Sequence, residues 1–352
     1  MLAERRGRIL SLVVEEHVDS ALPVGSEAIV RKYHLGVSPA TIRNEMAKLE
    51  EEGYIGHPHT SAGRIPTERG YRYYVESLME EEDLPWEQKQ TILHQFHQAG
   101  REWEEWLHLA VAVLARSARN MAVVTVPRSA QCRLRHIELV SLQEVVALLV
   151  VVLEETRVRQ HVLSLPEPLT QDELSEVAHR LTQLCVGLTA AQIRLTAAPL
   201  SAVEGHVVRA VLELMLTEDE AGHEEAYLEG LQHVLSQPEF SRSDKILALL
   251  EALDERNLTR AIPFRRLADV GVKVIIGSEH LALGRPALAA PRAGWADAMR
   301  DCSVVVARYG APGALSGALA VLGPTRMHYP RTISTVRYVS SLMSELLESY
   351  YN

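Results

Sequence analysis

The chain of 352 residues is long enough for two or three domains with cores of their own. Its formal net charge of −10 argues, over the whole chain, against a nucleic-acid partner, because a polyanion binds a basic surface. Three cysteines without a CxxC pair indicate neither a disulfide framework nor a zinc knuckle and favour the reduced cytoplasm, and the apolar run at 145–153 is shorter than the ~20 residues of a membrane helix.

The chain begins with a pattern typical of an amphipathic helix. Residues 4–17 space their apolar side chains along one helical face, and the charged N-terminus lacks the apolar core of a signal peptide. Pro23 and Gly25 then indicate a turn, after which Ser26 is expected to cap a second, short helix. We therefore expect a soluble protein that starts with two packed helices.

A third helix is predicted after Ser38, which takes the N-cap position and is followed by a proline whose missing N–H costs nothing there. It runs to Glu52 and ends at Gly53, because glycine adopts the left-handed conformation most readily. Residues 54–67 indicate two short strands joined by a turn of small residues, and Thr67 is expected to cap a further helix. Three helices, a hairpin and a helix are the order of a winged helix-turn-helix.

The rest of the chain predicts an α+β domain interrupted by helices. Residues 80–118 are expected to form a connecting helical segment. Runs rich in valine and isoleucine favour an antiparallel meander within 119–190, and strand-like runs return within 262–352 before a closing helix. Helical periods fill 191–261, so this segment is predicted to be an insertion into one α+β domain.

The third helix has two faces of different character. Ile42, Met46 and Leu49 fall in one narrow stripe, which is predicted to pack on the first two helices. The opposite face carries forked donors, an amide and small or methyl-bearing groups, which are the groups that read base edges in a major groove. The predicted base readers are Ala40, Thr41, Arg43, Asn44, Ala47 and Lys48. Taken alone they are equally well explained as solvated residues, and it is the flanking caps and hairpin that favour DNA.

The hairpin is predicted to supply backbone contacts with DNA. Small residues at its tip allow phosphates to approach backbone amides, and Arg64 is expected to reach a phosphate or a minor groove. Residues 57–72 hold three arginines and one acid, so the local charge outweighs the objection from the whole chain, with the acidic run at Glu50–Glu52 expected to face away from the duplex. The predicted backbone and wing contacts are Ser38, His59, Thr60, Ser61, Gly63 and Arg64.

The stretch from 23 to 75 closely resembles the bacterial heat-inducible transcription repressor HrcA family, above all in SPATIRNEM and PHTSAGRIPT. The segments GALAVLGPTRMHYPRTISTVRYVSSLMSELL and LSQPEF resemble the same family. The resemblance implies a winged-helix domain at 1–79, a GAF-like domain at 119–190 and 262–352, and a dimerisation domain inserted at 191–261. It also implies a dimer that represses chaperone operons by binding an inverted-repeat operator called CIRCE, and a GroE chaperonin that helps to keep the repressor active.

A physical argument for a homodimer stands beside the resemblance. Two modules related by a two-fold axis read two half-sites on one face of double-stranded DNA, so a palindromic operator mirrors the symmetry of the protein. The contact between the two copies is expected to be apolar, and packing within the domain is an equally good account of any one candidate. The predicted dimerisation residues are Val203, Val207, Val211, Leu214, Ile246 and Leu250.

An enzyme is the first competing class, and no Walker loop, HExxH, GxSxG or strand-linked GxGxxG is present. Cys132 near His136 could suggest a nucleophile and its base, although a cysteine is more often a buried small hydrophobe. His94, His97 and His108 are expected on a polar helix rather than around a metal. We therefore predict no catalysis, no metal and no cofactor.

A ligand sensor is the second competing class. A GAF-like domain in which the glycine-rich segment 311–324 lines a cleft would make the protein a ligand-responsive winged-helix regulator, although turns and strand bends explain those glycines equally well. RNA binding is disfavoured, because the major groove of A-form RNA excludes side chains.

Overall fold

The computed structural model describes residues 2–58, 63–100, 102–129, 131–154, 157–195, 200–221, 226–241, 243–252, 271–280, 299–311 and 315–351. It divides into two compact units, each built from helices and antiparallel strands as predicted for the α+β class. Unit 1 comprises Met1–Pro127, His223–Ala311 and Gly317–Asn352, and unit 2 comprises Arg128–Gly222 and Pro312–Ser316.

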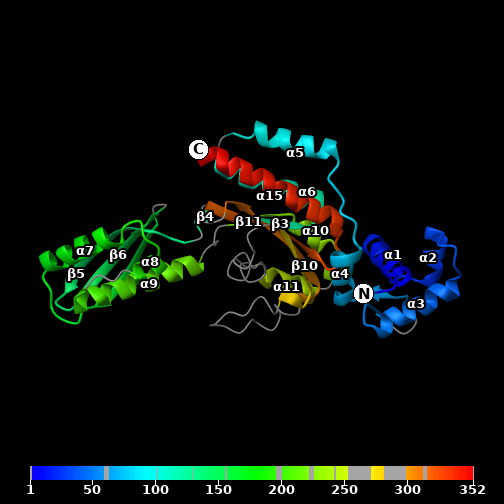
Figure 1. Ribbon diagram of the computed structural model, residues 1–352, viewed down its shortest axis with the longest axis horizontal. Helices are drawn as coiled ribbons and strands as arrows, with labels where there is room; N and C mark the ends of the chain where they lie inside the picture. Colours follow the sequence, from blue (N-terminus) through cyan, green and yellow to red (C-terminus); the bar gives the residue numbers. More distant parts are fainter. Residues whose placement is uncertain are drawn as a thin grey trace. The chain divides into compact units, whose positions relative to one another are not determined.

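The N-terminal part of unit 1 has the predicted order of three helices, a hairpin and a helix (Figure 1). Its elements are α1 (Glu4–Ser20), α2 (Ser26–Tyr33), α3 (Pro39–Glu51), β1 (Ile55–Gly56), β2 (Ile65–Pro66), α4 (Glu68–Tyr73) and the π-helical turn η1 (Tyr74–Leu78). Strands β1 and β2 pair antiparallel, and an isolated bridge joins Val24 to Arg64. We call residues 2–78 the head.

Local sequence signals explain where these helices begin and end. The Ser38 side chain accepts a hydrogen bond from the backbone N–H of Thr41, and Thr67 caps α4 in the same way. Gly53 has a φ of 78°, and the Tyr54 N–H donates to the Leu49 carbonyl, which closes α3 in a Schellman motif. The expected cap at Ser26 is wrong, because Ser26 is the first residue of α2 and no side chain caps that helix.

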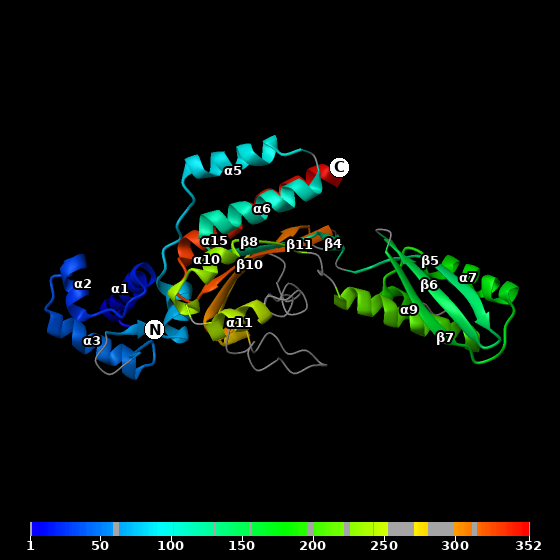
Figure 2. The same cartoon turned by 180° about the vertical axis from the view of Figure 1, so that it is seen from behind.

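A sheet buried on both faces forms the core of unit 1 (Figure 2). Helices α6 (Trp103–Ala118) and α15 (Tyr329–Tyr351) cover one face, and α10 (Leu231–Leu235), the 3₁₀ turn η3 (Pro238–Phe240) and α11 (Ser243–Ala252) pack on the other. Burial on both sides explains why its central strands are nearly continuous apolar runs. The strand order is β8 (Ala226–Glu229), β3 (Met121–Thr125), β11 (Leu315–Pro324), β10 (Cys302–Gly310) and β9 (Val272–Ile276), with β4 (Arg128–Ser129) paired to the start of β11.

The segment predicted to be a connector is two helices, α5 (Trp86–Gln98) and α6. Helix α6 packs against β3, β8 and α15, and Leu107, Val111 and Leu114 are fully buried. It is therefore a layer of the domain rather than a link between domains, since its apolar stripe covers the sheet.

Unit 2 is a three-stranded antiparallel meander with helices on one face. Its strands β5 (Leu134–Gln143), β6 (Val146–Leu153) and β7 (Val158–Ser164) pair as predicted for the meander, whereas β3, which the prediction placed in the same meander, pairs with β8 and β11 in unit 1. The helices are α7 (Gln171–Cys185), α8 (Ala190–Leu195) and α9 (Ala202–Ala221). Burial alternates strictly along β6, as expected of a sheet with one covered and one open face.

The boundaries of the two units differ from those of the predicted domains. The prediction assigned the meander to the domain that surrounds the insertion and began the insertion at 191. In the structure the meander packs with α7, α8 and α9 in unit 2, whereas β8, α10 and α11 belong to unit 1. Which sheet a strand joins depends on pairing between distant residues, which the local apolar pattern does not encode.

Candidate nucleic-acid interface

Helix α3 buries one face against α1 and α2 and exposes the other. Ile42, Met46 and Leu49 are buried, as predicted for the packing stripe. The candidate readers lie on the remaining surface. Ala40, Arg43, Asn44 and Lys48 are exposed, and Thr41 and Ala47 are half-buried.

Two of these side chains have unused hydrogen-bonding groups. Within the residues that the structure describes, Arg43 and Asn44 make no side-chain hydrogen bond or ion pair. Lys48 lies 3.5 Å from the Glu45 carboxylate, and the Thr41 hydroxyl lies 3.0 Å from the Ser38 hydroxyl. Since α3 needs neither Arg43 nor Asn44 for its own packing, both are available to a partner.

A charged contact joins the hairpin to the C-terminal end of α3. The Arg64 guanidinium donates to the Glu50 carboxylate from Nε at 3.1 Å and lies 3.0 Å from it through Nη2. The His57 ring lies 3.3 Å from the other oxygen of the same carboxylate. Glu50 therefore lies beside the hairpin rather than apart from it, and Arg64 holds the two elements together, with its side chain only 17% exposed.

The other two arginines counted as part of a basic hairpin region are also engaged within the protein. Arg69 donates to the Glu52 carbonyl at 2.7 Å and stacks on the Tyr54 ring at 4.5 Å. Arg72 forms an ion pair with Glu279. The charge of Arg72 is thus paired with an acid, and the donors of Arg69 are partly used within the fold, so the local count of cations overstated what this surface offers to DNA.

The acids of α3 are neutralised from α1. Arg6 donates to Glu45 from Nε at 3.2 Å and also contacts the Glu52 carboxylate. The hydrogen bond from Arg6 holds the pKa of the Glu45 carboxyl below its usual value. A DNA backbone approaching α3 therefore meets Glu45, Glu50 and Glu52 already paired with arginines.

Gly63 has a structural reason to be glycine. A Cβ there would lie 2.6 Å from the Val24 carbonyl oxygen and 2.7 Å from its carbon. The next residue, Arg64, exchanges backbone hydrogen bonds with Val24 at 2.8 and 2.9 Å. The hairpin thus lies directly on the chain between α1 and α2. The predicted contacts His59, Thr60 and Ser61 lie outside the described residues.

Arg6, Val24 and Glu50 are parts of this site that the sequence did not single out. Each of these residues contacts a partner at least 14 positions away in the sequence. Helical periodicity relates only neighbouring residues and therefore cannot predict these contacts. The one local signal was the excess of glutamates at the end of α3, which needs cations nearby to be stable.

The predicted dimerisation residues fall in different places. Val203, Val207 and Val211 are buried in the core of unit 2 beneath the meander, and Leu214 packs against that core. On α11, Ile246 is half-buried and Leu250 is exposed. The stripe on α9 thus has its partner within its own unit, which was the alternative account of these residues.

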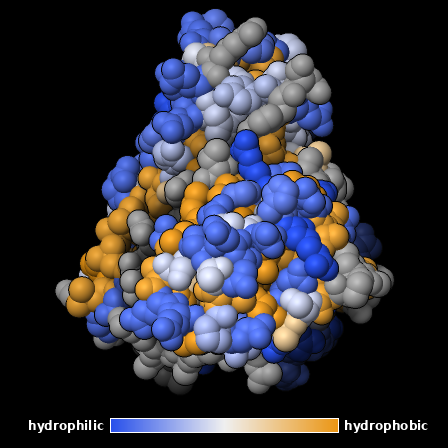
Figure 3. All heavy atoms as spheres, turned by 90° about the vertical axis from the view of Figure 1, so that its left-hand side faces the viewer, coloured by the Kyte–Doolittle hydropathy of each residue, from blue (hydrophilic) through white to orange (hydrophobic). Residues whose placement is uncertain are grey.

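An open apolar face lies on the other side of the meander. The strand register places Val140 opposite Leu148, and Leu148 opposite Val162, on this uncovered side. We define the open face as Val140, Leu148, Val150, Val152, Val158 and Val162, each exposed or half-buried. Figure 3 shows one face of the molecule, on which apolar residues reach the surface among polar ones.

The side chains considered for catalysis do not form a nucleophile and base. The Cys132 thiol donates to the Met215 carbonyl, and His136 pairs with Glu138 at 3.2 Å, so no hydrogen bond joins the two. Burial, with the nearby Asp219 carboxylate, raises the pKa of the Cys132 thiol to about 12. At neutral pH this sulfur is a protonated thiol.

Within the described residues, no group of three His, Cys, Asp or Glu side chains is placed to bind a metal ion. Among the helices of that part of the chain, none has both the length and the apolar character to cross a membrane.

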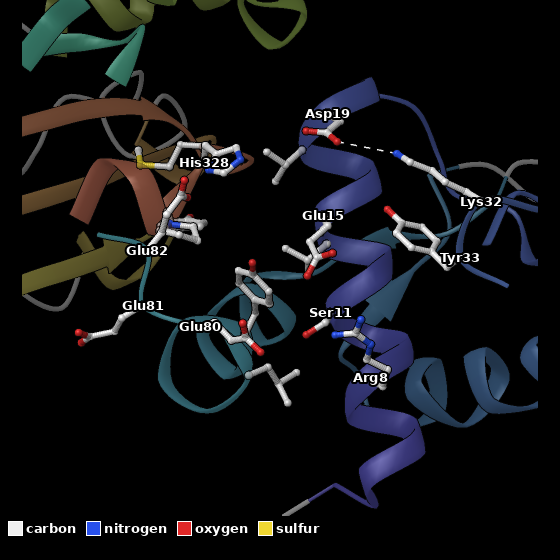
Figure 4. A pocket seen from close by; sticks show the side chains of 17 residues that line it. Arg8, Ser11, Glu15, Asp19, Lys32, Tyr33, Glu80, Glu81, Glu82 and His328 are labelled. Atoms are coloured by element: carbon white, nitrogen blue, oxygen red, sulfur yellow. Dashed lines mark ion pairs between the residues drawn. The ribbon is translucent and has the colours of Figure 1, made fainter. Parts of the chain in front are cut away.

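A cavity of about 630 Å³ opens between α1, η1 with the residues after it, and the start of α15 (Figure 4). Its walls carry Glu15 and Asp19 from α1, and Glu80, Glu81 and Glu82 after η1. Burial, more than any neighbour, raises the pKa of Glu15. The glycine-rich segment suggested for a ligand cleft does not line it, and residues 312–314 of that segment lie outside the described residues.

Comparisons with known proteins agree on one family. A family model described as "HrcA protein C terminal domain" matches residues 104–333. The heat-inducible transcription repressor HrcA of Chloroflexus aggregans is 45% identical over 100% of this chain and 94% of its own length. That of Roseiflexus castenholzii is 43% identical over 99% and 96%. A solved crystal structure described as a hypothetical protein covers 99% of this chain and 98% of its own, with 23% identity and a TM-score of 0.56, which indicates a shared fold.

We expect Gly63→Ala to destabilise the head by about 1–3 kcal/mol, because its Cβ would overlap the backbone of Val24 rather than a movable side chain. Denaturant unfolding measures the loss. Gly56→Ala on the other hairpin strand is the matched control, since its Cβ would meet its nearest neighbour, Thr67, at an ordinary 3.8 Å. Equal stability of the two variants would contradict the close approach at Val24.

We expect Cys132 in the native protein to react very slowly with a thiol reagent at pH 8. A pKa of about 12 leaves roughly 10⁻⁴ of the sulfur as thiolate, against roughly a quarter for an ordinary cysteine. Because the folded pKa is raised, the rate should increase about tenfold for each pH unit. All three cysteines should react rapidly after denaturation, and rapid native labelling at neutral pH would show that the thiol is activated.

Proposed function

The chain belongs to the heat-inducible transcription repressor HrcA family, and from that membership we propose that it represses heat-shock chaperone operons by binding their DNA. The proposed target is the inverted-repeat operator CIRCE, bound by a dimer. The head acts as the winged helix-turn-helix, the two-sided sheet of unit 1 as the GAF-like domain, and unit 2 as the inserted dimerisation domain.

The observation that carries this proposal is the exposed face of α3. Arg43 and Asn44 have free donors on a helix whose opposite face is fully committed to packing. A guanidinium matches the two acceptors of guanine in the major groove, and a carboxamide matches the donor and acceptor of adenine. Ala40 and Ala47 beside them are short, so the helix backbone can approach the base edges closely.

The hairpin supports the proposal through position rather than charge. Arg64 and Gly63 hold it against α3 and Val24, and its two strands contact α3 and α1. Backbone N–H groups of such a turn bind phosphates without a net positive charge. The tip residues His59, Thr60 and Ser61 remain predicted phosphate contacts.

For the dimer we propose the open face of the meander. A palindromic operator needs two heads related by a two-fold axis, and such an axis brings the same patch of both copies together. The apolar side chains of the open face run across all three strands, with His136, Glu138 and Gln160 among them, whereas the helix-covered face of the same sheet is already filled. A second copy covering it would remove a contiguous apolar patch from water.

The GroE chaperonin is proposed as a regulatory partner on family grounds. In that proposal the free chaperonin keeps the repressor active, and unfolded proteins that occupy the chaperonin relieve repression. The proposed compartment is the cytoplasm, where DNA and chaperonin are both present.

We expect Arg43→Ala to weaken operator binding by roughly 1–3 kcal/mol. The variant should also lose its preference at one base position of each half-site. The physical reason is the loss of a bidentate donor to a base edge. A competition assay against operators mutated at single positions measures both effects.

Arg31→Ala is the comparison, because Arg31 is an exposed cation on α2 that has no partner in the described part of the chain. It should weaken all sequences alike and reduce the salt dependence by about one phosphate contact. If Arg43→Ala weakened random DNA as much as the operator, Arg43 would be a phosphate contact and its assignment as a base reader would be wrong.

We expect Val162→Lys to weaken the dimer by at least about tenfold in dissociation constant, because it places a charge in the proposed apolar contact. Val162 is 57% exposed, so the substitution should leave the fold of the monomer intact. Sedimentation over a range of protein concentrations measures the effect. Val186→Lys, 52% exposed elsewhere on unit 2, is the control, and similar dissociation constants for both variants would place the dimer contact elsewhere.

A further inference from the structure

Helix α4 joins the head to the edge of the unit 1 sheet through polar contacts of Arg72 and Glu68. Arg72 donates from Nε to the Glu279 carboxylate at 2.8 Å, and its Nη2 contacts the second oxygen of that carboxylate. The same Nη2 donates to the carbonyl of Val274 on the edge strand β9 at 2.8 Å. A planar guanidinium held at a carboxylate and a carbonyl together fixes an orientation as well as a distance.

The turn that follows β9 is shaped to receive α4. Glu68 accepts hydrogen bonds from the Ser278 backbone N–H at 3.0 Å and from the Ser278 hydroxyl. Gly277 has a φ of 53°, and a Cβ there would lie 2.3 Å from a Glu68 carboxylate oxygen. Glu279 also accepts from the Ile276 N–H at 2.9 Å, so the acceptor for Arg72 is itself held in place.

A cavity occupies part of the contact region between the head and the rest of unit 1, which we call the joint. The cavity of about 630 Å³ separates α1 from the residues after η1 and the start of α15, and Glu15 and Asp19 share it with Glu80 and Glu82 (Figure 4). Arg8 and Lys32 line the same cavity, and Lys32 lies 3.9 Å from the Asp19 carboxylate, so its walls carry charges of both signs.

The buried Tyr71 hydroxyl has no hydrogen-bond partner among the described residues. The Tyr71 ring itself is buried against Tyr329, with 6.0 Å between the ring centroids. Apolar contact therefore contributes to holding the head, and the directional polar contacts add an orientation to it.

A second polar contact holds the other end of the joint. Arg326 donates to the Val18 carbonyl in the last turn of α1 at 3.1 Å. Its remaining donors bind Glu239 and Gln237, next to the sheet of unit 1. We call the part of unit 1 outside the head the sheet domain, and Arg326 is anchored there. Two arginines thus hold α4 and α1, and Arg72 is the one on the helix that directly follows the hairpin in the chain.

From these contacts we infer that Arg72 is a positioning residue for operator binding, which it serves by holding α3 at one angle to the sheet of unit 1. The inference rests on the proposed function, since it concerns a dimer on an inverted repeat. When two heads are held at a fixed angle, binding of the first half-site places the second head at its own half-site. A head free to rotate loses that advantage, although its own contact with DNA is unchanged.

Arg72 is set apart from a DNA contact by the use of its donors. The guanidinium is bound by Glu279 and the Val274 carbonyl and also lies 3.6 Å from Glu76, so a phosphate would have to displace these groups. A role in positioning therefore predicts a loss that depends on the arrangement of two half-sites, and a role in contact predicts a loss on every DNA.

The test compares Arg72→Ala with the unmodified full-length chain on three kinds of DNA: the inverted repeat, a single half-site, and inverted repeats whose half-sites are moved apart or together by a few base pairs. We expect half-site affinity within about twofold of the unmodified protein. Affinity for the natural inverted repeat should fall roughly tenfold, and the dependence on spacing should become flatter. Glu279→Gln should behave in the same way.

Glu76→Ala is the matched control. Glu76 lies one helical turn after Arg72 and contacts it, and among the described residues its side chain makes no hydrogen bond or ion pair with the strands of the unit 1 sheet. It should keep the affinity and the spacing dependence of the unmodified protein. Unfolding curves of all variants separate positioning from loss of fold, because a head that is merely destabilised would lose half-site binding as well.

A measurement without DNA keeps this inference separate from the proposed function. Spin labels at Glu27→Cys on α2 and Glu348→Cys on α15, both exposed positions in unit 1, report the distance between head and sheet domain. Arg72→Ala should broaden the distance distribution and Glu76→Ala should not. An unchanged distribution, an unchanged spacing dependence, or an equal loss on the half-site would each overturn the inference, whereas an unmodified protein without preference for the inverted repeat would overturn the proposed function alone.

Discussion

The contact between Glu50 and Arg64 is the interaction on which the N-terminal surface depends. It joins the acidic end of α3 to the hairpin, and the backbone of the same Arg64 pairs with Val24 between α1 and α2. One residue thereby links the third helix, the hairpin and the chain between the first two helices. The two free side chains on α3, Arg43 and Asn44, are presented by a scaffold that this link closes.

The charge that this protein offers to DNA depends on which charged side chains are paired in the folded structure. Counts of charged residues along the sequence do not show this pairing. The net charge of −10 argued against DNA, and a local excess of arginines argued for it. Arg64, Arg69 and Arg72 are each bound to an acid or a carbonyl within the fold, while Arg6 neutralises acids of α3 from a distant position. What remains for a polyanion is a small set of unpaired donors, and such a set favours reading of bases over general attraction to phosphate.

Much of the head was predictable, because its signals are local. Ser38, Gly53 and Thr67 act within four residues of themselves, and the burial of the α3 stripe follows from helical period alone. The family resemblance was likewise carried by contiguous motifs. Ser26 was assigned wrongly because Gly25 beside it is equally able to take the cap position, and neighbouring residues alone do not decide between them.

Other parts of the fold were beyond prediction from one sequence, because they depend on pairing between distant residues. The apolar period of Val203, Val207 and Val211 showed that α9 buries a face, and only the structure identified the meander as what it is buried against. The same limit applies to the division into units, since strand register is set by partners far along the chain. Local and distant determinants also differ physically. Apolar burial, including that of Tyr71 against Tyr329, stabilises the head and the sheet without direction, whereas the hydrogen bonds of Arg72 and Arg326 are directional, and we infer that they fix the angle between the two. A repressor that must present two α3 helices at one separation needs both kinds of interaction, because a well-packed head on an undirected joint would bind each half-site and still fail to favour the pair.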